Sequence, residues 1–80
     1  MYFVYVLQSK KNKKLYYGLT KDLENRLEEH NKGSVPSTKS RLPFDLVYFE
    51  KVDTVSEARK KERYFKSGFG RKYIKGKLTH

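Results

Sequence analysis

The sequence predicts a small α+β fold, in which a central antiparallel three-stranded sheet is flanked by helices in the order β-β-α-β-α-α. Three runs of aromatic and β-branched residues indicate the strands, and two stretches with apolar residues at helical spacing indicate helices. The chain has 80 residues, which suffice for one domain with a thin core. We therefore expect a single domain over residues 1–80.

The first two strands are expected to form an antiparallel hairpin. Residues 2–7 are dense in aromatic and β-branched side chains, which is typical of a central strand covered on both faces. Residues 8–13 are polar and turn-like, and the chain returns as a second strand over residues 14–19.

The first helix is expected to begin near Leu23, with Thr20 or Asp22 as its N-cap. Four residues spaced i, i+3, i+4 and i+7 share one of its faces: Leu23, Arg26, Leu27 and His30. Residues 31–34 should end this helix, and a flexible polar stretch is expected up to Pro43.

The remaining elements follow from alternation and capping. A third strand is expected over residues 44–50, in which alternate positions are occupied by Phe44, Leu46, Tyr48 and Glu50. Thr54 and Glu57 have the spacing of a capping box, so a second helix should run from Val55 to Lys66. Gly68 and Gly70 are expected to break it before a last helix over residues 71–78.

Charge favours a polyanionic partner such as nucleic acid. The formal charge is +10, and residues 58–80 carry nine basic side chains against one acid, Glu62. Each Lys or Arg that neutralises a phosphate releases counterions, so this asymmetry suits a nucleic acid. Lys72, Lys75 and Lys77 are candidate phosphate contacts. A solvated helix face that keeps a small protein soluble would account for the same charges.

Composition also limits the cellular compartment. The chain has no cysteine, which excludes disulfides and thiolate metal sites and fits a reducing cytoplasm. No apolar run reaches the ~18 residues of a membrane helix, and the first residues lack the basic region of a signal peptide. We expect a soluble, cytoplasmic protein.

Glu62 occupies an unusual position in the second predicted helix. It shares an apolar stripe with Val55, Ala58 and Phe65, at i, i+3, i+7 and i+10. A carboxylate there is costly to bury without compensation. An ion pair with a nearby Arg or Lys is the commoner solution, and candidates are Arg59, Lys66 and Arg26. A divalent metal ion is the functional alternative, because it prefers oxygen ligands.

Arg26 and His30 are open to two interpretations as well. Arg26 can bind a phosphate oxygen through its planar guanidinium, or pair with Glu29 or Asp22 along the helix. His30 can take part in proton transfer, or form structural hydrogen bonds at the helix end.

The twelve aromatic residues should divide in the same way between packing and function. Four of them are expected in the core: Phe3, Phe44, Phe49 and Phe65. Tyr5 and Tyr16 lie on paired strands near the helix with Arg26, where a phenol can give or accept a proton. Phe69 or Tyr73, among the basic residues at the end of the chain, can stack on a base.

Residues 15–26, Leu-Tyr-Tyr-Gly-Leu-Thr-Lys-Asp-Leu-Glu-Asn-Arg, followed by His30-Asn31, resemble the GIY-YIG nuclease family. Phe3-Val4-Tyr5 stands where that family has its first triplet, and Glu-Ala-Arg at 57–59 leads to Glu62 as in its metal-binding helix. The resemblance covers nearly the whole chain. It is strongest to small stand-alone members related to the N-terminal nuclease domain of the excision-repair protein UvrC.

The resemblance implies a role for each candidate residue. Tyr5 and Tyr16 would be the motif tyrosines, one of which activates or orients the attacking water. Gly18 would be a point of close backbone approach to the nucleic acid. Arg26 would stabilise charge on the phosphate, and His30 would assist proton transfer. Glu62 would hold Mg²⁺ or Mn²⁺, which favours a single-metal mechanism because only one carboxylate is supplied.

The implied function is that of a metal-dependent endonuclease that hydrolyses phosphodiester bonds in DNA, with a structure-specific or repair role. Phe3 and Tyr17 depart from the Gly and Ile of the two triplets, and no Asn follows Glu62. No second domain supplies target specificity within these residues, so the activity is expected to be weak, structure-specific or dependent on a protein partner. Three alternatives stay open: a non-catalytic nucleic-acid-binding module, an RNA-directed nuclease, and a basic accessory subunit.

Overall fold

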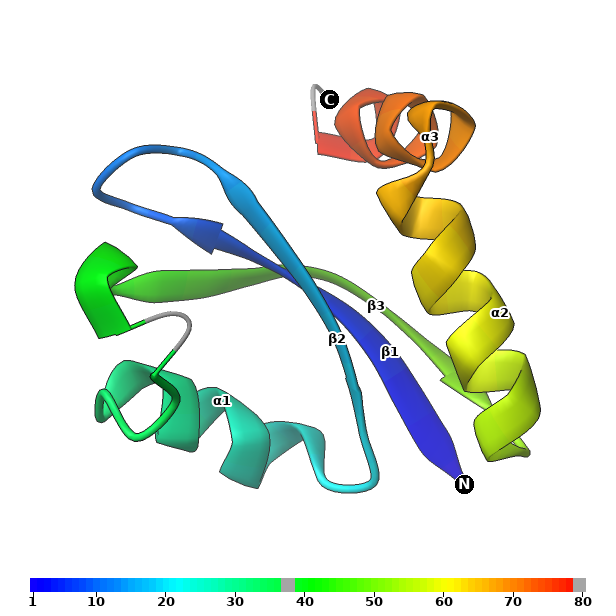
Figure 1. Ribbon diagram of the computed structural model, residues 1–80, viewed down its shortest axis with the longest axis horizontal. Coiled ribbons are helices and arrows are strands. Elements are labelled where there is room, and N and C mark those ends of the chain that lie inside the picture. The colour runs from blue at the N-terminus through cyan, green and yellow to red at the C-terminus, as the bar shows by residue number, and fades with distance from the viewer. Residues whose placement is uncertain (37–38, 79–80) are drawn as a thin grey trace.

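The computed structural model describes residues 1–36 and 39–78 and has the predicted α+β order of elements (Figure 1). Its strands are β1 (Tyr2–Ser9), β2 (Leu15–Thr20) and β3 (Phe44–Val52), and they form one antiparallel sheet in the order β2-β1-β3. Its helices are α1 (Leu23–Asn31), the short 3-10 helix η1 (Lys39–Arg41), α2 (Val55–Lys66) and α3 (Gly68–Leu78). The predicted polar stretch contains η1, and its residues 37–38 lie outside the described part.

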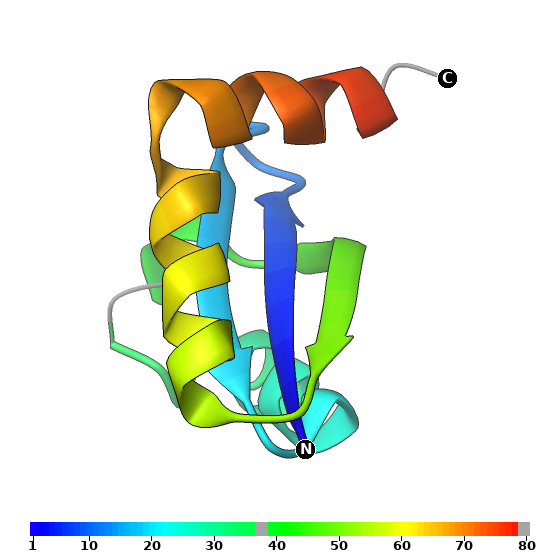
Figure 2. The same ribbon diagram turned by 90° about the vertical axis from the view of Figure 1, so that its right-hand side faces the viewer.

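The sheet has a helix on each face, as Figure 2 shows with α2 in front of the strands and α1 behind them. Alternate residues of β1 explain this arrangement, because successive side chains of a strand point to opposite faces. Tyr5 and Leu7 pack with Phe44 on the α1 face. Val4 and Val6 pack with a second cluster on the α2 face, completed by Tyr17, Val52, Ala58, Phe65 and Ile74.

A β-bulge at Val47 in the middle of β3 changes the face of the sheet to which the following side chains point. Val6 pairs with Tyr48 but Leu7 pairs with Leu46, so Val47 is an extra residue. Consequently Leu46 packs on the α1 face, whereas Val47 and Tyr48 both pack on the α2 face. The strand was predicted correctly, but the regular alternation expected through residues 44–50 is wrong.

The predicted N-caps of the first two long helices are present. Asp22, rather than Thr20, caps α1 by accepting a hydrogen bond from the Asn25 backbone N–H at 3.1 Å. Thr54 caps α2 through the backbone N–H of Glu57 at 3.2 Å. These short side-chain acceptors satisfy backbone donors that have no partner within the helix.

The break between α2 and α3 is shorter than expected. Ser67 alone leaves helical geometry, with ψ 166°, and its Oγ accepts from the Gly70 backbone N–H at 3.3 Å. The last helix therefore begins at Gly68 rather than at residue 71. Gly70 is buried where α3 crosses the end of α2, and a Cβ there would lie 2.5 Å from the Phe65 Cα.

Phe49 was also expected in the core, but it is not part of it. Its side chain is 50% exposed beside Phe3 on the α1 face, with ring centroids 6.1 Å apart. The other three predicted core phenylalanines are buried or half-buried. None of the helices in residues 1–36 and 39–78 is long and apolar enough to cross a membrane.

Candidate active site

The α1 face of the hairpin brings Tyr5 and Gly18 together. The two residues are cross-strand partners in β1 and β2, and the Tyr5 ring lies over the Gly18 backbone. A Cβ at Gly18 would lie 2.5 Å from the Tyr5 Cζ, so only glycine leaves room for this ring. The Tyr5 side chain is thereby held against the sheet, with 2% of its surface exposed.

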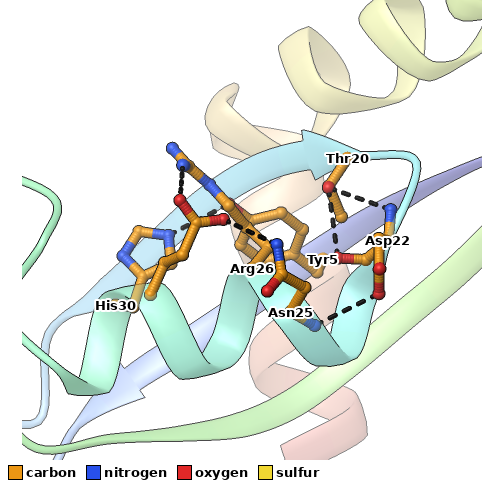
Figure 3. Close-up of polar contacts among 7 residues, drawn as sticks. Tyr5, Thr20, Asp22, Asn25, Arg26 and His30 are labelled. Carbon is orange, nitrogen blue, oxygen red and sulfur yellow. Dashed lines mark hydrogen bonds and ion pairs between the residues drawn. The ribbon is translucent and has the colours of Figure 1, made fainter.

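Helix α1 adds Arg26 and His30, which are one turn apart and point to the Tyr5 hydroxyl (Figure 3). The Arg26 Nε–H donates to the Tyr5 Oη at 3.4 Å, and the Tyr5 Oη lies 3.1 Å from the His30 Nε2. The Arg26 Nη1 also pairs with the Glu29 carboxylate at 3.6 Å. Arg26 thus makes one of the pairings expected for it along the helix, and it contacts Tyr5 as well.

Burial keeps both partners of the Tyr5–His30 hydrogen bond neutral. Burial raises the pKa of the Tyr5 phenol, although the Arg26 guanidinium opposes the shift. Burial, aided by the charge of Arg26, lowers the pKa of His30, while Glu29 opposes it. Because Arg26 can only donate, the Tyr5 Oη accepts from it and its own hydrogen is available to a neutral His30 Nε2.

The predicted catalytic residues on this face fall into a buried pair and a partly exposed pair. His30 is fully buried and Tyr5 nearly so, whereas Tyr16 is half-buried and the Arg26 side chain is 33% exposed. The Tyr16 ring packs edge-on against His30, with centroids 5.0 Å apart. Tyr16 and Arg26 can therefore meet a substrate directly, and His30 can act on one only through a neighbour.

Glu62 lies on the other face of the sheet, on α2. Its side chain is 24% exposed and forms an ion pair with Lys66 at 3.7 Å, one of the partners expected from the sequence. It lines an open pocket with Leu19, Arg59 and Arg63. Its charge also contributes to raising the Tyr5 pKa, so the two groups interact electrostatically.

The surroundings of Glu62 bear on the expected metal ion. No group of three or more His, Asp or Glu side chains within the described ranges is arranged to hold a metal. Glu62 offers one accessible carboxylate, and Mg²⁺ commonly takes one or two carboxylates with water and substrate phosphate as its other ligands. The residues fit such a site, in which the substrate completes the coordination.

The three candidate lysines of α3 are exposed but do not share one side of the helix. Lys75 lines a pocket beside the hairpin, whereas Lys77 lies over the Tyr73 ring, 5.3 Å from its centroid. Lys72 is also on the surface. Arg71 lines the same pocket one helical turn before Lys75, and Lys13 and Lys14 line it from the hairpin. Sequence analysis missed the two hairpin lysines, because they lie far from α3 along the chain.

The site thus combines two hairpin tyrosines, an arginine anchored on one of them and, across the sheet, a carboxylate whose charge acts on the Tyr5 phenol. The family model for the GIY-YIG catalytic domain matches residues 1–75. The chain belongs to the GIY-YIG family, which is a family of nucleases, and nucleic acid is therefore the class of substrate that its membership implies.

The relatives support the same assignment. A UPF0213 protein of Staphylococcus saprophyticus is 40% identical over 75 residues, covering 92% of this chain and 90% of its own. A UPF0213 protein of Syntrophus aciditrophicus is 44% identical over 66 residues, covering 80% of this chain and 75% of its own. The solution NMR structure of the UPF0213 protein from Bacillus halodurans has a TM-score of 0.58 and 29% identity, covering 95% of this chain and 84% of that one.

Proposed function

We propose that this protein is a divalent-metal-dependent endonuclease that hydrolyses phosphodiester bonds in DNA. The observation that carries the proposal is the anchoring of Arg26, whose Nε contacts the Tyr5 hydroxyl while its side chain stays partly exposed. A guanidinium held at its Nε in this way can turn its Nη groups from the partly exposed Glu29 carboxylate to a phosphate while its Nε stays in place. A helix that only packed on the sheet would not need an arginine at this buried hydroxyl.

The buried and exposed residues take different roles in this proposal. Arg26 binds the nonbridging oxygens of the phosphate and stabilises the charge that develops on them. Tyr16, the more accessible phenol, orients the attacking water. Tyr5 positions Arg26, and the neutral His30 accepts the Tyr5 hydrogen bond, so that the phenol can take up or pass on a proton.

Glu62 would hold the metal ion, either Mg²⁺ or Mn²⁺, and the chemistry supplied there would be polarisation of the phosphate and stabilisation of the leaving oxygen. Arg59 and Arg63 line the same pocket and would attract the substrate backbone to it. The Lys66 ammonium, already paired with Glu62, would move away as the metal enters.

Target choice is proposed to depend on the shape of the DNA or on a protein partner, in a structure-specific or repair-related role. Arg59 and Arg63 make the surface beside Glu62 basic, and phosphate contacts carry no sequence information by themselves. The Tyr5 ring fills the space beside Gly18, so this glycine would serve the packing of Tyr5, and the DNA backbone would approach the site at Tyr16 and Arg26 instead.

The test is cleavage of labelled duplex, branched and single-stranded DNA, and of matched RNA, with Mg²⁺, with Mn²⁺ and with a chelator. We expect metal-dependent cleavage of DNA. Arg26→Ala should keep the fold but lower kcat about 10²-fold or more, because a preorganised charge is lost. Cleavage of RNA alone would identify an RNA-directed nuclease, and binding without cleavage under all conditions would identify a binding module.

A further inference from the structure

A second basic site lies away from Tyr5 and Arg26, between the β1–β2 hairpin and helix α3. Figures 1 and 2 place the hairpin and α3 at the same end of the molecule. An open pocket between them is lined by Lys13, Lys14, Leu15, Tyr17, Arg71 and Lys75. We call this the hairpin pocket. Its polar lining consists of four cationic side chains and one phenol.

The charges of the hairpin pocket are not compensated within the described residues. No carboxylate lines the pocket, and its four cations form none of the ion pairs found in residues 1–36 and 39–78. Like charges gathered on one surface repel one another, so their grouping favours an anionic ligand. Arg71 also lies close enough to Tyr17 to lower the pKa of that phenol, against the stronger effect of burial.

The hairpin turn holds its two lysines in a fixed conformation. Lys13 has a positive φ of 64°, and its carbonyl accepts a hydrogen bond from the Gln8 side chain at 3.1 Å. The Lys14 backbone N–H donates to the Asn12 side chain at 3.0 Å. The Ser9 carbonyl accepts from the Lys13 backbone N–H at 2.9 Å. A turn fixed by three bonds presents its side chains with little loss of backbone freedom on binding.

The hairpin pocket is aligned with the Glu62 pocket along β2. Leu15 and Tyr17 belong to the first, Leu19 belongs to the second, and all three residues pack on the α2 face. Four residues of a strand span about 13 Å, a distance that a short stretch of nucleic-acid backbone covers. A nucleic-acid backbone that follows β2 would reach both pockets.

We propose that the hairpin pocket binds a backbone phosphate of the nucleic-acid substrate, a few nucleotides away from the phosphate that is cleaved. This inference rests on the proposed nuclease function, which it extends by a positioning site. The pocket would set the register of the strand on β2 and contribute affinity, without taking part in bond cleavage.

The experiment compares two triple variants of the full chain. K14Q/R71Q/K75Q removes three charges from the hairpin pocket, and K32Q/K51Q/K60Q removes three from exposed positions elsewhere. Cleavage kinetics and fluorescence anisotropy are measured for both at one ionic strength. The pocket variant should raise KM and Kd about tenfold or more, as expected when charge-assisted hydrogen bonds to one phosphate are lost. Its kcat should stay within about twofold of the wild type.

Substrate length provides a second readout that a merely structural role would not change. On substrates shortened by one nucleotide at a time, wild type and pocket variant should become equal once the strand no longer reaches the pocket. Equal losses in the pocket and control variants, or a difference that is independent of length, would overturn the inference while leaving the nuclease function intact. Pocket-dependent binding without any cleavage would overturn the nuclease function and keep the phosphate site.

A third measurement separates backbone phosphate from free phosphate. Inorganic phosphate is titrated at constant ionic strength, and the backbone amide shifts of residues 13, 14 and 71 are followed by NMR. An oligonucleotide should shift these amides at far lower concentration than phosphate does. Saturation by inorganic phosphate with no response to oligonucleotides would show a free-anion site and overturn the inference.

Discussion

Burial divides the residues around the Tyr5 hydroxyl into those that support the site and those that can touch a substrate. Tyr5 and His30 are shielded by the sheet and α1, whereas Tyr16 and Arg26 remain accessible. The sequence left His30 open between a structural and a catalytic role. Its complete burial favours a positioning role exercised through Tyr5.

The neutral state of His30 makes the stability of the fold dependent on pH. Its folded pKa lies below the ordinary value of 6.5, so the unfolded chain binds the proton more readily. The free energy of unfolding should therefore decrease as pH falls from about 6.5 towards the folded pKa, and should not change through this group above pH ~7.5. Urea denaturation at pH 7.5, 6.5 and 5.5 measures this change in the free energy of unfolding.

The matched variant for this measurement is His30→Gln, which cannot titrate but keeps a polar group opposite Tyr5. It should show a smaller difference in stability between pH 7.5 and 5.5 than the wild type. An identical difference in both proteins would show that His30 is not the group responsible.

Glu62→Gln separates the metal role from a structural one. The Glu62–Lys66 pair is partly exposed, and such pairs contribute about 0–1 kcal/mol, so the substitution should change the unfolding free energy little. Metal-dependent cleavage should be abolished, while nucleic-acid binding without metal is retained. Thermal unfolding and cleavage are measured on the same sample, with Glu28→Gln as the control. Undiminished cleavage would reject Glu62 as the metal ligand.

At the scale of elements, local sequence patterns predicted the strands and helices correctly. Tertiary contacts account for the features that differ from the prediction. The aromatic runs, the helical spacing and the Thr54 capping box specified strands and helices because each acts within a few residues. The Val47 bulge depends on how β3 pairs with β1, and alternation alone does not reveal it. The early start of α3 depends on the Ser67 side chain, whose Oγ accepts from the Gly70 backbone N–H and so caps the helix. Gly68 and Gly70 therefore lie in its first turn.

Gly70 supplies a test of the α2–α3 packing. A Cβ at this position would meet the backbone of Tyr64 and Phe65, which cannot rotate away. Gly70→Ala should therefore destabilise the protein by about 1–3 kcal/mol. Gly76→Ala, in the same helix with open space around the new methyl group, should instead stabilise it by up to about 1 kcal/mol. Denaturation curves for the two variants should shift in opposite directions, and a stabilised Gly70→Ala protein would contradict this packing.

At the scale of the whole molecule, composition predicted the class of partner but not where that partner would lie. The excess of basic residues in the second half of the chain is plain from the sequence. Folding brings Arg71 and Lys75 beside the hairpin lysines and directs Lys77 to Tyr73 instead. Charges far apart in the chain thus form local surfaces that only the arrangement of β2 and α3 defines.

The net charge of +10 leads to a prediction about salt. Affinity for nucleic acid should fall steeply as salt rises, because each phosphate contact contributes about −0.9 to the slope of log K against log salt. Neutralising Lys72, Lys75 and Lys77 together should weaken binding similarly for all sequences. Of the single variants, Lys75→Gln should have a larger effect than Lys77→Gln. Anisotropy titrations from 50 to 300 mM salt measure both, and affinity that is insensitive to salt would contradict the prediction.

The Val47 bulge also bears on how copies of this protein behave towards one another. In the order β2-β1-β3, β3 is an edge strand, whose outer N–H and C=O groups are a template for pairing with another chain. A bulge interrupts the regular spacing of those groups and increases the local twist. A second molecule could then match only short segments on either side of Val47. The irregularity that turns Tyr48 to the α2 face thereby also makes the β3 edge a poor template for edge-to-edge pairing.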